Sequence, residues 1–241
     1  MRLVSKGLLE HTLQIMTGYN RDMGTLTTDY REAIERLPDG ATLTIHQVSW
    51  EEYEGLLEEL AEQPHRRVSY DGGKLEIMTP LPEHEAYARF IDDVVRVLSE
   101  ELGLTLEKRG STTWKRRRLA KGVEPDACYY VTNADRIIGK GRIDLDSDPP
   151  PDIVVEIDVT NESLGKFPIY ASLAVREIWR YDGNTVRFYE RAGDGYREVS
   201  ESPSFGGLTP TILADALQRS KTHGQTLALR EFRSRSRGST S

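Results

Sequence analysis

Acidic residues close together on one predicted strand are the first sign of chemistry in this chain. Glu156 and Asp158 stand two positions apart in the β-branched run of residues 152–160, and side chains at i and i+2 of a strand share a face. Two acids on a buried strand need a cation, a basic partner or hydrogen bonds, because burying an unpaired carboxylate is costly. The pattern therefore indicates either a cation site or salt bridges to the many arginines.

Asp126 and Lys166 could complete a cation site. Asp126 follows Pro125 at the start of the preceding strand candidate, from which its carboxylate could reach Glu156. Converging carboxylates suit Mg²⁺ or Mn²⁺, which prefer hard oxygen ligands. Such a cation best serves phosphodiester hydrolysis, since it orients a phosphate oxygen and lowers the pKa of the attacking water. Lys166 would add an ammonium group that stabilises either the attacking hydroxide or the pentavalent phosphorus.

A basic segment offers a candidate contact for phosphate groups. It runs from Lys108 to Lys121, includes Trp114 and contains no acid. The cations assigned to a nucleic-acid surface are Lys115, Arg116, Arg117, Arg118 and Lys121. The alternative is a solvated strand or loop that balances an acidic body. The formal charge of −7 argues against tight non-specific coating of nucleic acid, because the whole molecule would repel phosphates.

Hydrophobic periodicity predicts the elements that position these residues. The strand candidates are residues 67–70, 74–78, 107–115, 126–132, 152–160, 177–181 and 185–191, with glycine-containing turns making hairpins of the first and last pairs. The helix candidates are residues 29–37, the segment after a capping box of Ser49 and Glu52, residues 83–102 before Gly103, residues 163–174 with a regular part beginning near Pro168, and residues 208–217. Helices before and after a central run of strands predict one α/β domain.

Composition limits the class of protein. The 241 residues suffice for one domain of ordinary size or two small ones. No run approaches the roughly 18 apolar residues of a membrane span, and the first ten residues lack the apolar block of a secretory signal, so we expect a soluble, cytoplasmic protein without membrane contact. The single cysteine, Cys128, excludes an intramolecular disulfide framework and a multi-cysteine zinc site.

Several blocks of sequence occur in an order that resembles the Uma2 family. They are residues 70–80, 82–85, 123–126, 150–158, and 166–170 followed by 177–182. The resemblance covers residues 43–217. It implies the PD-(D/E)XK restriction-endonuclease-like fold, which is a mixed central β-sheet flanked by helices, with the active-site acids on core strands.

The resemblance also implies roles for individual residues. Asp126 matches the aspartate of the PD element and Glu156 the acid of the (D/E)XK element, so both would hold Mg²⁺ or Mn²⁺. Asp158 occupies the strand position where related nucleases usually carry a lysine. Lys166 matches the lysine that Uma2 sequences carry downstream, and it would reach the same point from another backbone position.

Two residues ahead of the core would supplement this site. Glu76 is a candidate metal or water ligand, and His84 a candidate base or phosphate donor. A solvated glutamate and a capping or packing histidine are the alternatives. The chain departs from the usual family pattern at Ala127 and Gly165, where acids are frequent, and at residues 174–176, where Ala-Val-Arg replaces Gly-Val-Pro. No principal ligand is lost.

These features together predict a single-domain, metal-dependent endonuclease acting on DNA. Residues 1–42 would be an N-terminal extension, residues 43–220 the nuclease domain, and residues 221–241 a polar, basic, disordered tail. One alternative is an inactive nuclease-fold module that binds DNA or protein, and another is an acidic structural domain whose carboxylates are all salt-bridged. A symmetric homodimer would ease cleavage of both strands, although the sequence shows no clear interface stripe.

Overall fold

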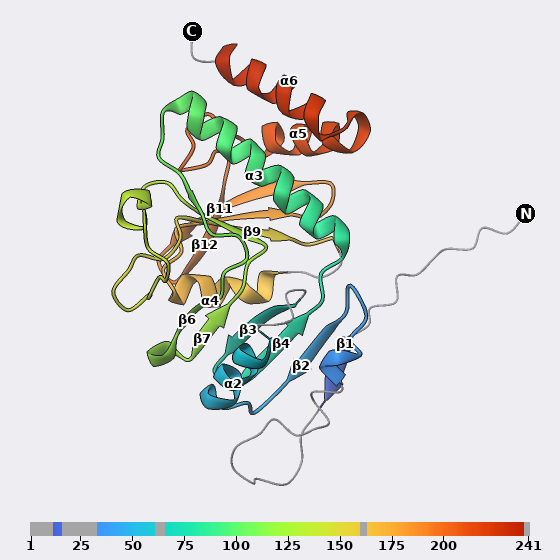
Figure 1. Cartoon of the computed structure of the whole chain (residues 1–241), viewed down its shortest axis with the longest axis vertical. Coiled ribbons are helices and arrows are strands. Elements are labelled where there is room, and N and C mark those ends of the chain that lie inside the picture. The colour runs from blue at the N-terminus through green and yellow to red at the C-terminus, as the bar shows by residue number, and fades with distance from the viewer. Residues whose placement is uncertain (1–11, 16–32, 61–65, 160–162, 239–241) are drawn as a thin grey trace, which may run out of the picture.

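Two six-stranded sheets form the frame of the protein in the computed structural model, which describes residues 12–15, 33–60, 66–159 and 163–238 (Figure 1). The first sheet has the order β1 (Thr12–Ile15), β2 (Thr42–Ile45), β4 (Lys74–Met78), β3 (Arg67–Asp71), β7 (Lys121–Val123), β6 (Trp114–Arg116). The second has the order β12 (Gly195–Val199), β11 (Val186–Ala192), β10 (Glu177–Tyr181), β9 (Ile153–Ile157), β8 (Ala127–Tyr130), β5 (Glu107–Lys108). Each sheet is mixed, because β1 and β2 run parallel in the first sheet and β9 and β10 in the second.

Helices cover both sheets. They are α2 (Trp50–Leu60), α3 (Pro82–Leu102), α4 (Phe167–Ser172), α5 (Pro210–His223) and α6 (Gln225–Gly238), with short 3₁₀ helices η1 (Arg117–Leu119), η2 (Ala134–Arg136) and η3 (Leu164–Lys166). The predicted ends of two helices are confirmed: Ser49 and Glu52 form the capping box of α2, and Gly103 ends α3 at a φ of 66°. The mixed α/β class is likewise confirmed.

Strands β8, β9 and β10 of the second sheet are buried on both faces, and alternation along each strand decides toward which face a side chain points. Val155 and Ile157 lie on the face that packs against α3, α5 and α6. Val154 lies on the opposite face, with α4 and with Trp114 and Val123 of the first sheet. Because side chains alternate along a strand, Glu156 points to the same side as Val154, toward α4 and the first sheet. Figure 1 shows α4 between the strands of the two sheets.

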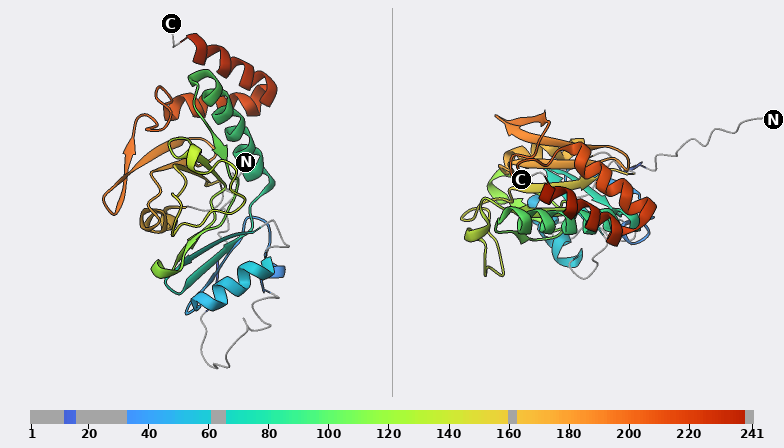
Figure 2. Two further views of the ribbon diagram at one scale, coloured as in Figure 1. Left: turned by 60° about the vertical axis from the view of Figure 1, so that its left-hand side comes forward. Right: turned by 90° about the horizontal axis from the view of Figure 1, so that it is seen from above.

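The first sheet has its own apolar cluster, covered by α2 (Figure 2). Its centre is a stacked pair of rings, Tyr53 of α2 and Tyr70 of β3, with centroids 4.7 Å apart. Gly122 of β7 lies directly under this pair, because a Cβ atom at that position would stand 2.0 Å from the Tyr53 hydroxyl oxygen. Glycine at position 122 therefore permits the close approach of α2 to the sheet.

The segment predicted as one strand over residues 107–115 is wrong. The structure has two short strands there: β5 pairs with β8 in the second sheet, and β6 pairs with β7 in the first. Residues 109–113 cross between the sheets, and Gly110 takes a φ of 57° in this crossing. The chain returns after β7, where Glu124, Pro125 and Asp126 alone connect the first sheet to β8 of the second.

The predicted disordered tail is also wrong, because residues 221–223 belong to α5 and residues 225–238 form α6. Ala228 and Phe232 stand four positions apart on one face of this helix and are buried. Arg233 holds the helix against α3 through Glu100 and Glu101, at 2.7 and 2.9 Å. An amphipathic stripe inside a Ser- and Arg-rich sequence thus gains enough apolar contact to fold. Residues 239–241 lie outside the described part of the chain.

Part of the predicted N-terminal extension belongs to the first sheet. β1 pairs with β2, and Ile34 is buried in the apolar cluster under α2. Of the helix predicted over residues 29–37, residues 33–35 are helical and residues 29–32 lie outside the described residues. Across residues 12–15, 33–60, 66–159 and 163–238, no helix has the length and apolar composition needed to cross a membrane.

Candidate active site

Asp126 and Glu156 meet where β8 begins and β9 ends. The two strands run antiparallel with Ala127 opposite Val155, which places Asp126 beside Glu156. The Asp126 backbone N–H donates to the Val155 carbonyl at 3.0 Å, and its Oδ2 accepts the Ile157 N–H at 2.8 Å. Both acids are buried, with 7% and 1% of their surface exposed, respectively. The predicted convergence of these carboxylates is present in the structure.

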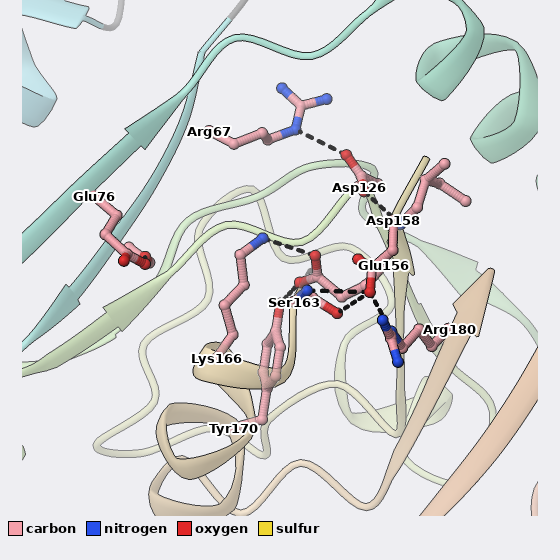
Figure 3. A network of polar contacts seen from close by, with 11 residues as sticks. Arg67, Glu76, Asp126, Glu156, Asp158, Ser163, Lys166, Tyr170 and Arg180 are labelled. Carbon is pink, nitrogen blue, oxygen red and sulfur yellow. Dashed lines mark hydrogen bonds and ion pairs between the residues drawn. The ribbon is translucent and has the colours of Figure 1, made fainter. Parts of the chain in front are cut away.

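Lys166 and Tyr170 approach Glu156 from η3 and α4. The Lys166 Nζ donates to Oε2 of Glu156 at 2.7 Å, and the Tyr170 hydroxyl donates to Oε1 (Figure 3). The two residues are four apart, so they lie on one face of the helical segment. Pro168 stands in the first turn of α4, as predicted. Each oxygen of the Glu156 carboxylate therefore has its own donor.

Burial and neighbouring charges shift the pKa values of Glu156 and Lys166. Burial raises the pKa of Glu156 to about 7; the charge of Lys166 opposes the rise, while Asp126 and Asp158 add to it. Burial alone would lower the pKa of Lys166, but Glu156 and Asp126 together raise it. Lys166 therefore remains an ammonium at neutral pH, and the Glu156 carboxyl group titrates near neutrality.

Asp158 lies next to Glu156, but its carboxylate serves other partners. Its Oδ2 accepts the backbone N–H and the hydroxyl of Ser163, each at 3.0 Å, and also the Nε–H of Arg180. Arg180 stands on β10 directly beside Glu156 in the parallel register. In Figure 3 the Arg180 guanidinium reaches Asp158 from the side opposite Lys166. Asp158, predicted as a catalytic residue, thus contacts a serine and an arginine.

Arg67 joins the site from the first sheet, and no pattern in the sequence predicted this. Its Nε lies 3.6 Å from Oδ1 of Asp126, and its terminal nitrogen lies 2.5 Å from Oε1 of Glu85. The guanidinium is buried, so it neutralises part of the charge on Asp126. A basic residue at the start of a hairpin is ordinary in sequence, and its place in the site follows from the approach of the two sheets.

Glu124 is a second site residue that sequence reasoning did not single out. Burial raises its pKa to about 7, while the charges of Arg67 and Lys166 oppose the rise. These effects place the carboxyl group of Glu124 near the same cations that serve Asp126 and Glu156. Its position two residues before Asp126, within one of the blocks that resemble Uma2, was the available signal.

The two supplementary residues differ in location. His84, at the start of α3, is 1% exposed; burial lowers its pKa, and the charge of Asp126 opposes that effect. It therefore lies near Asp126 and favours the neutral imidazole. Glu76 lies on the first sheet, where Lys74 holds one carboxylate oxygen at 2.6 Å and the Ser69 hydroxyl stands 3.5 Å from the other. Figure 3 shows Glu76 apart from Asp126 and Glu156.

The basic segment forms ion pairs within the protein. The pairs are Lys115 with Glu54 at 2.7 Å, Arg116 with Asp146 at 3.7 Å, Arg117 with Glu54 at 3.1 Å and with Glu51, Arg118 with Asp146 at 3.3 Å, and Lys121 with Asp71. A phosphate group at this surface would compete with these carboxylates. The alternative of a basic strand that balances neighbouring acids accounts for the contacts.

The donor set can be compared with the needs of a hard cation. Within the described residues, no group of three or more His, Cys, Asp or Glu side chains is arranged to hold a metal. Mg²⁺, however, is usually bound through one or two carboxylates and keeps several waters. Asp126 and Glu156 provide two adjacent buried carboxylates. Burial raises the pKa of Glu156 and the charges of Asp126 and Asp158 add to the rise, so a bound cation would oppose both effects. These two residues therefore fit a divalent cation such as Mg²⁺.

The match to a family model agrees with the sequence resemblance. The sequence model of the Uma2 family, described as "Putative restriction endonuclease", matches residues 50–221. A crystal structure of "a putative nuclease belonging to DUF820" from Anabaena variabilis ATCC 29413 is similar, with a TM-score of 0.44 and 18% sequence identity, over 66% of this chain and 96% of that one. No curated protein matches the chain.

Proposed function

This chain belongs to the Uma2 family, and we propose that it is a cytoplasmic, Mg²⁺- or Mn²⁺-dependent endonuclease that hydrolyses phosphodiester bonds in DNA. The observation that supports the proposal most directly is the meeting of Asp126, Glu156 and Lys166 at one buried point. The three residues come from three separate segments. An acid pair with an ammonium group is the set of groups that phosphodiester hydrolysis uses.

Asp126 and Glu156 would hold the cation. When bound, the cation would orient a phosphate oxygen and lower the pKa of the attacking water. Tyr170 fixes the Glu156 carboxylate by donating to Oε1, so the carboxylate keeps one orientation. Arg67 lies beside Oδ1 of Asp126 and limits the repulsion between the two acids. These contacts preorganise the pair of carboxylates before substrate binds.

Lys166 would stabilise negative charge on the phosphate. Its neighbours raise its pKa, so it acts as a cationic hydrogen-bond donor and not as a base. In the structure its Nζ is bound to Glu156. If Glu156 holds the metal ion, the Lys166 ammonium group would be available to a phosphate oxygen.

The supplementary residues have lesser roles in this proposal. His84 is buried beside Asp126, so we assign it to supporting that side chain. Glu76 remains a candidate ligand of a water at the edge of the site. The segment formed by Lys115, Arg116, Arg117, Arg118 and Lys121 would attract the DNA backbone by exchanging its carboxylate partners for phosphates.

One observation favours the alternative of an inactive module with a nuclease fold. Lys166 and Tyr170 already donate hydrogen bonds to both oxygens of Glu156, so this carboxylate has partners without a metal ion. A protein that binds DNA or another protein without cleaving it could retain this arrangement for stability.

Metal-dependent melting separates these functions. With Mg²⁺ or Mn²⁺ at about 100 times its Kd, binding to the native state adds about 2.7 kcal/mol and should raise Tm by roughly 5–10 °C. Asp126→Asn and Glu156→Gln should abolish this increase, together with cleavage of supercoiled plasmid. Glu177→Gln is the matched control, because Glu177 is a fully buried glutamate on the neighbouring strand.

Each result has a distinct meaning. A metal-dependent rise in Tm with cleavage, both lost in the two site variants but retained in Glu177→Gln, supports the endonuclease. A rise in Tm without cleavage of duplex, nicked or single-stranded DNA supports the inactive module. A Tm that does not respond to either metal contradicts the proposal and favours a structural domain with salt-bridged acids.

A further inference from the structure

We propose that Asp158, neutralised by Arg180, is a positioning residue that sets Lys166 against Glu156 by holding Ser163. The catalytic consequence of this inference rests on the proposed function, whereas its geometric part does not. The sequence shows why Lys166 needs such a positioning residue. Lys166 stands ten residues after Glu156, beyond the end of β9, so the strand itself cannot fix its place.

Asp158 is well placed to anchor the connecting segment. β9 ends at Ile157, and Asp158 follows it immediately. Its backbone N–H donates to the Tyr181 carbonyl at 2.7 Å, which ties the residue to the end of β10. Its side chain is 2% exposed, so the carboxylate is held away from solvent. Asp158 is therefore held to the sheet by its backbone, and its buried carboxylate is available as a hydrogen-bond acceptor.

Ser163 transmits this position to Lys166. The N–H and the hydroxyl of Ser163 both donate to Oδ2 of Asp158 at 3.0 Å. The carbonyl of Ser163 in turn accepts the N–H of Lys166 at 2.8 Å. With the bond from Lys166 Nζ to Glu156, these contacts close a ring: Glu156, Asp158, Ser163, Lys166 and back to Glu156.

Arg180 allows Asp158 to serve as the anchor. The two buried acids beside each other at the end of β9 each have their own cation, Lys166 for Glu156 and Arg180 for Asp158. Without Arg180, the charge of Asp158 would compete with Glu156 for the ammonium group of Lys166. Because Arg180 pairs with Asp158, the Lys166 ammonium group can form its ion pair with Glu156.

Ser163 can be changed to test this ring of contacts without removing a charge. Ser163→Ala deletes the hydroxyl and keeps the backbone donor, so the protein should fold. In protein labelled with ¹³C at lysine Cε and free of metal, the Lys166 signal, assigned by its loss in Lys166→Arg, should move or broaden. With Mn²⁺ and plasmid DNA, kcat should fall on the order of 10-fold to 100-fold with KM unchanged, because small misplacements of a catalytic group cost this much.

Three further variants make the result specific. Ser163→Thr keeps a hydroxyl and should restore both the Lys166 signal and kcat. Ser99→Ala removes a buried serine hydroxyl that donates to the Val95 carbonyl at 2.8 Å in α3, so it repeats the chemical change away from the ring and should leave both unchanged. Asp158→Asn, if it folds, should shift the Lys166 signal further than Ser163→Ala does.

The possible failures are distinguishable. An unchanged Lys166 signal in folded Ser163→Ala overturns the inference, as does an equal change in Ser99→Ala. A specific shift of the signal with rescue by Ser163→Thr supports it, even if no variant and no wild-type protein cleaves DNA. In that last case the endonuclease proposal fails and the positioning of Lys166 stands.

Discussion

Ion pairs of the same chemical kind occur in two regions of this protein with very different surroundings. At the end of β9 the side chains of Glu156 and Asp158 are both 2% exposed, and their partners Lys166 and Arg180 are 15% and 9% exposed. In the basic segment, the exposed fractions are 67% for the Arg118 side chain and 58% for its partner Asp146. Both regions pair a basic side chain with a carboxylate, but the energetic cost of breaking the pair differs between them.

The difference lies in the cost of removing one partner. A buried pair has already lost its hydration, so deleting one member leaves an uncompensated charge that water cannot reach. An exposed pair loses little, because water and salt replace the partner. Burial also moves pKa values, as Glu156 shows. The acids at the end of β9 therefore have the sensitivity expected of a site, whereas an exposed pair such as Arg118 and Asp146 has the tolerance of a surface.

The largest expected effect comes from removing a buried cation. Lys166→Met should lower the free energy of unfolding by about 3–5 kcal/mol at pH 8, because buried Glu156 loses its cation and must then either stay charged or take up a proton at a pH where the unfolded chain holds none. The loss should be smaller at pH 5, where Glu156 takes up a proton. The matched change in the basic segment, Lys115→Met, should cost about 0–1 kcal/mol, because water reaches this pair: the Lys115 side chain is 34% exposed and that of its partner Glu54 is 33% exposed. Urea unfolding of both variants at both pH values measures this, and equal losses would break the comparison.

The next largest effect is a pH-dependent gain in stability, expected when Glu124 is replaced by glutamine. Its folded pKa of about 7 lies above its ordinary value of 4.5, so the folded state retains a proton that the unfolded state releases between these values. This group therefore lowers stability as pH rises from about 4.5 to 7. Glu124→Gln is neutral at every pH and should be more stable than wild type by about 1–3 kcal/mol at pH 8, with no difference below pH 4.

The control for this gain is Glu198→Gln, at an exposed glutamate of β12. It should change stability by less than about 0.5 kcal/mol at any pH. Denaturation curves collected from pH 4 to pH 8 give both results. A constant difference between Glu124→Gln and wild type across this range would show that burial of the charge is not the cause.

A smaller effect concerns the end of α4, the helix that carries Tyr170. Ala174 takes a φ of 65° there, and its N–H donates to Ala171 while that of Val175 donates to Tyr170. Glycine relieves the left-handed strain, so Ala174→Gly should add about 0.5–1 kcal/mol to the free energy of unfolding. The same change at Ala192, an exposed strand residue, should remove a similar amount. A loss at both positions would contradict the assigned strain.

The smallest effect on stability is expected in the basic segment. Arg117→Gln combined with Arg118→Gln should cost less than about 1 kcal/mol, because both side chains are exposed. If the segment contacts DNA, the slope of log Kobs against log salt should flatten by at most about 0.9 for each cation removed. Arg96→Gln, on the exposed side of α3, serves as the control. An unchanged slope in the double variant would remove the segment from the DNA surface.

Much of the site could be predicted from sequence, because its central residues lie in local patterns. Glu156 follows from alternation in a β-branched run, and Asp126 from the Pro-Asp step before the next strand. Lys166 was proposed from its charge and its place after Asp158, and the family resemblance added a motif match, whereas its distance along the chain from Glu156 alone predicts no contact. Tyr170 was within reach, because it stands four residues after Lys166 on the same helical segment.

What the sequence did not predict depends on how the two sheets meet. Arg67 reaches Asp126 only because the first sheet packs against the end of the second. The crossing at residues 109–113 has the composition of a continuous strand, so no local pattern marks it. In α6, Ala228 and Phe232 are the buried residues, and the surrounding serines and arginines conceal their spacing.

The return crossing between the sheets has a mechanical consequence. Glu124, Pro125 and Asp126 are the whole connection from β7 to β8, and the ring of Pro125 fixes its own φ. So short and stiff a link has no slack to absorb sliding of one sheet over the other. Any displacement of that kind would pull directly on the Asp126 carboxylate and change its separation from Glu156. The spacing of the two halves of the protein is thereby coupled to the geometry of its acid pair.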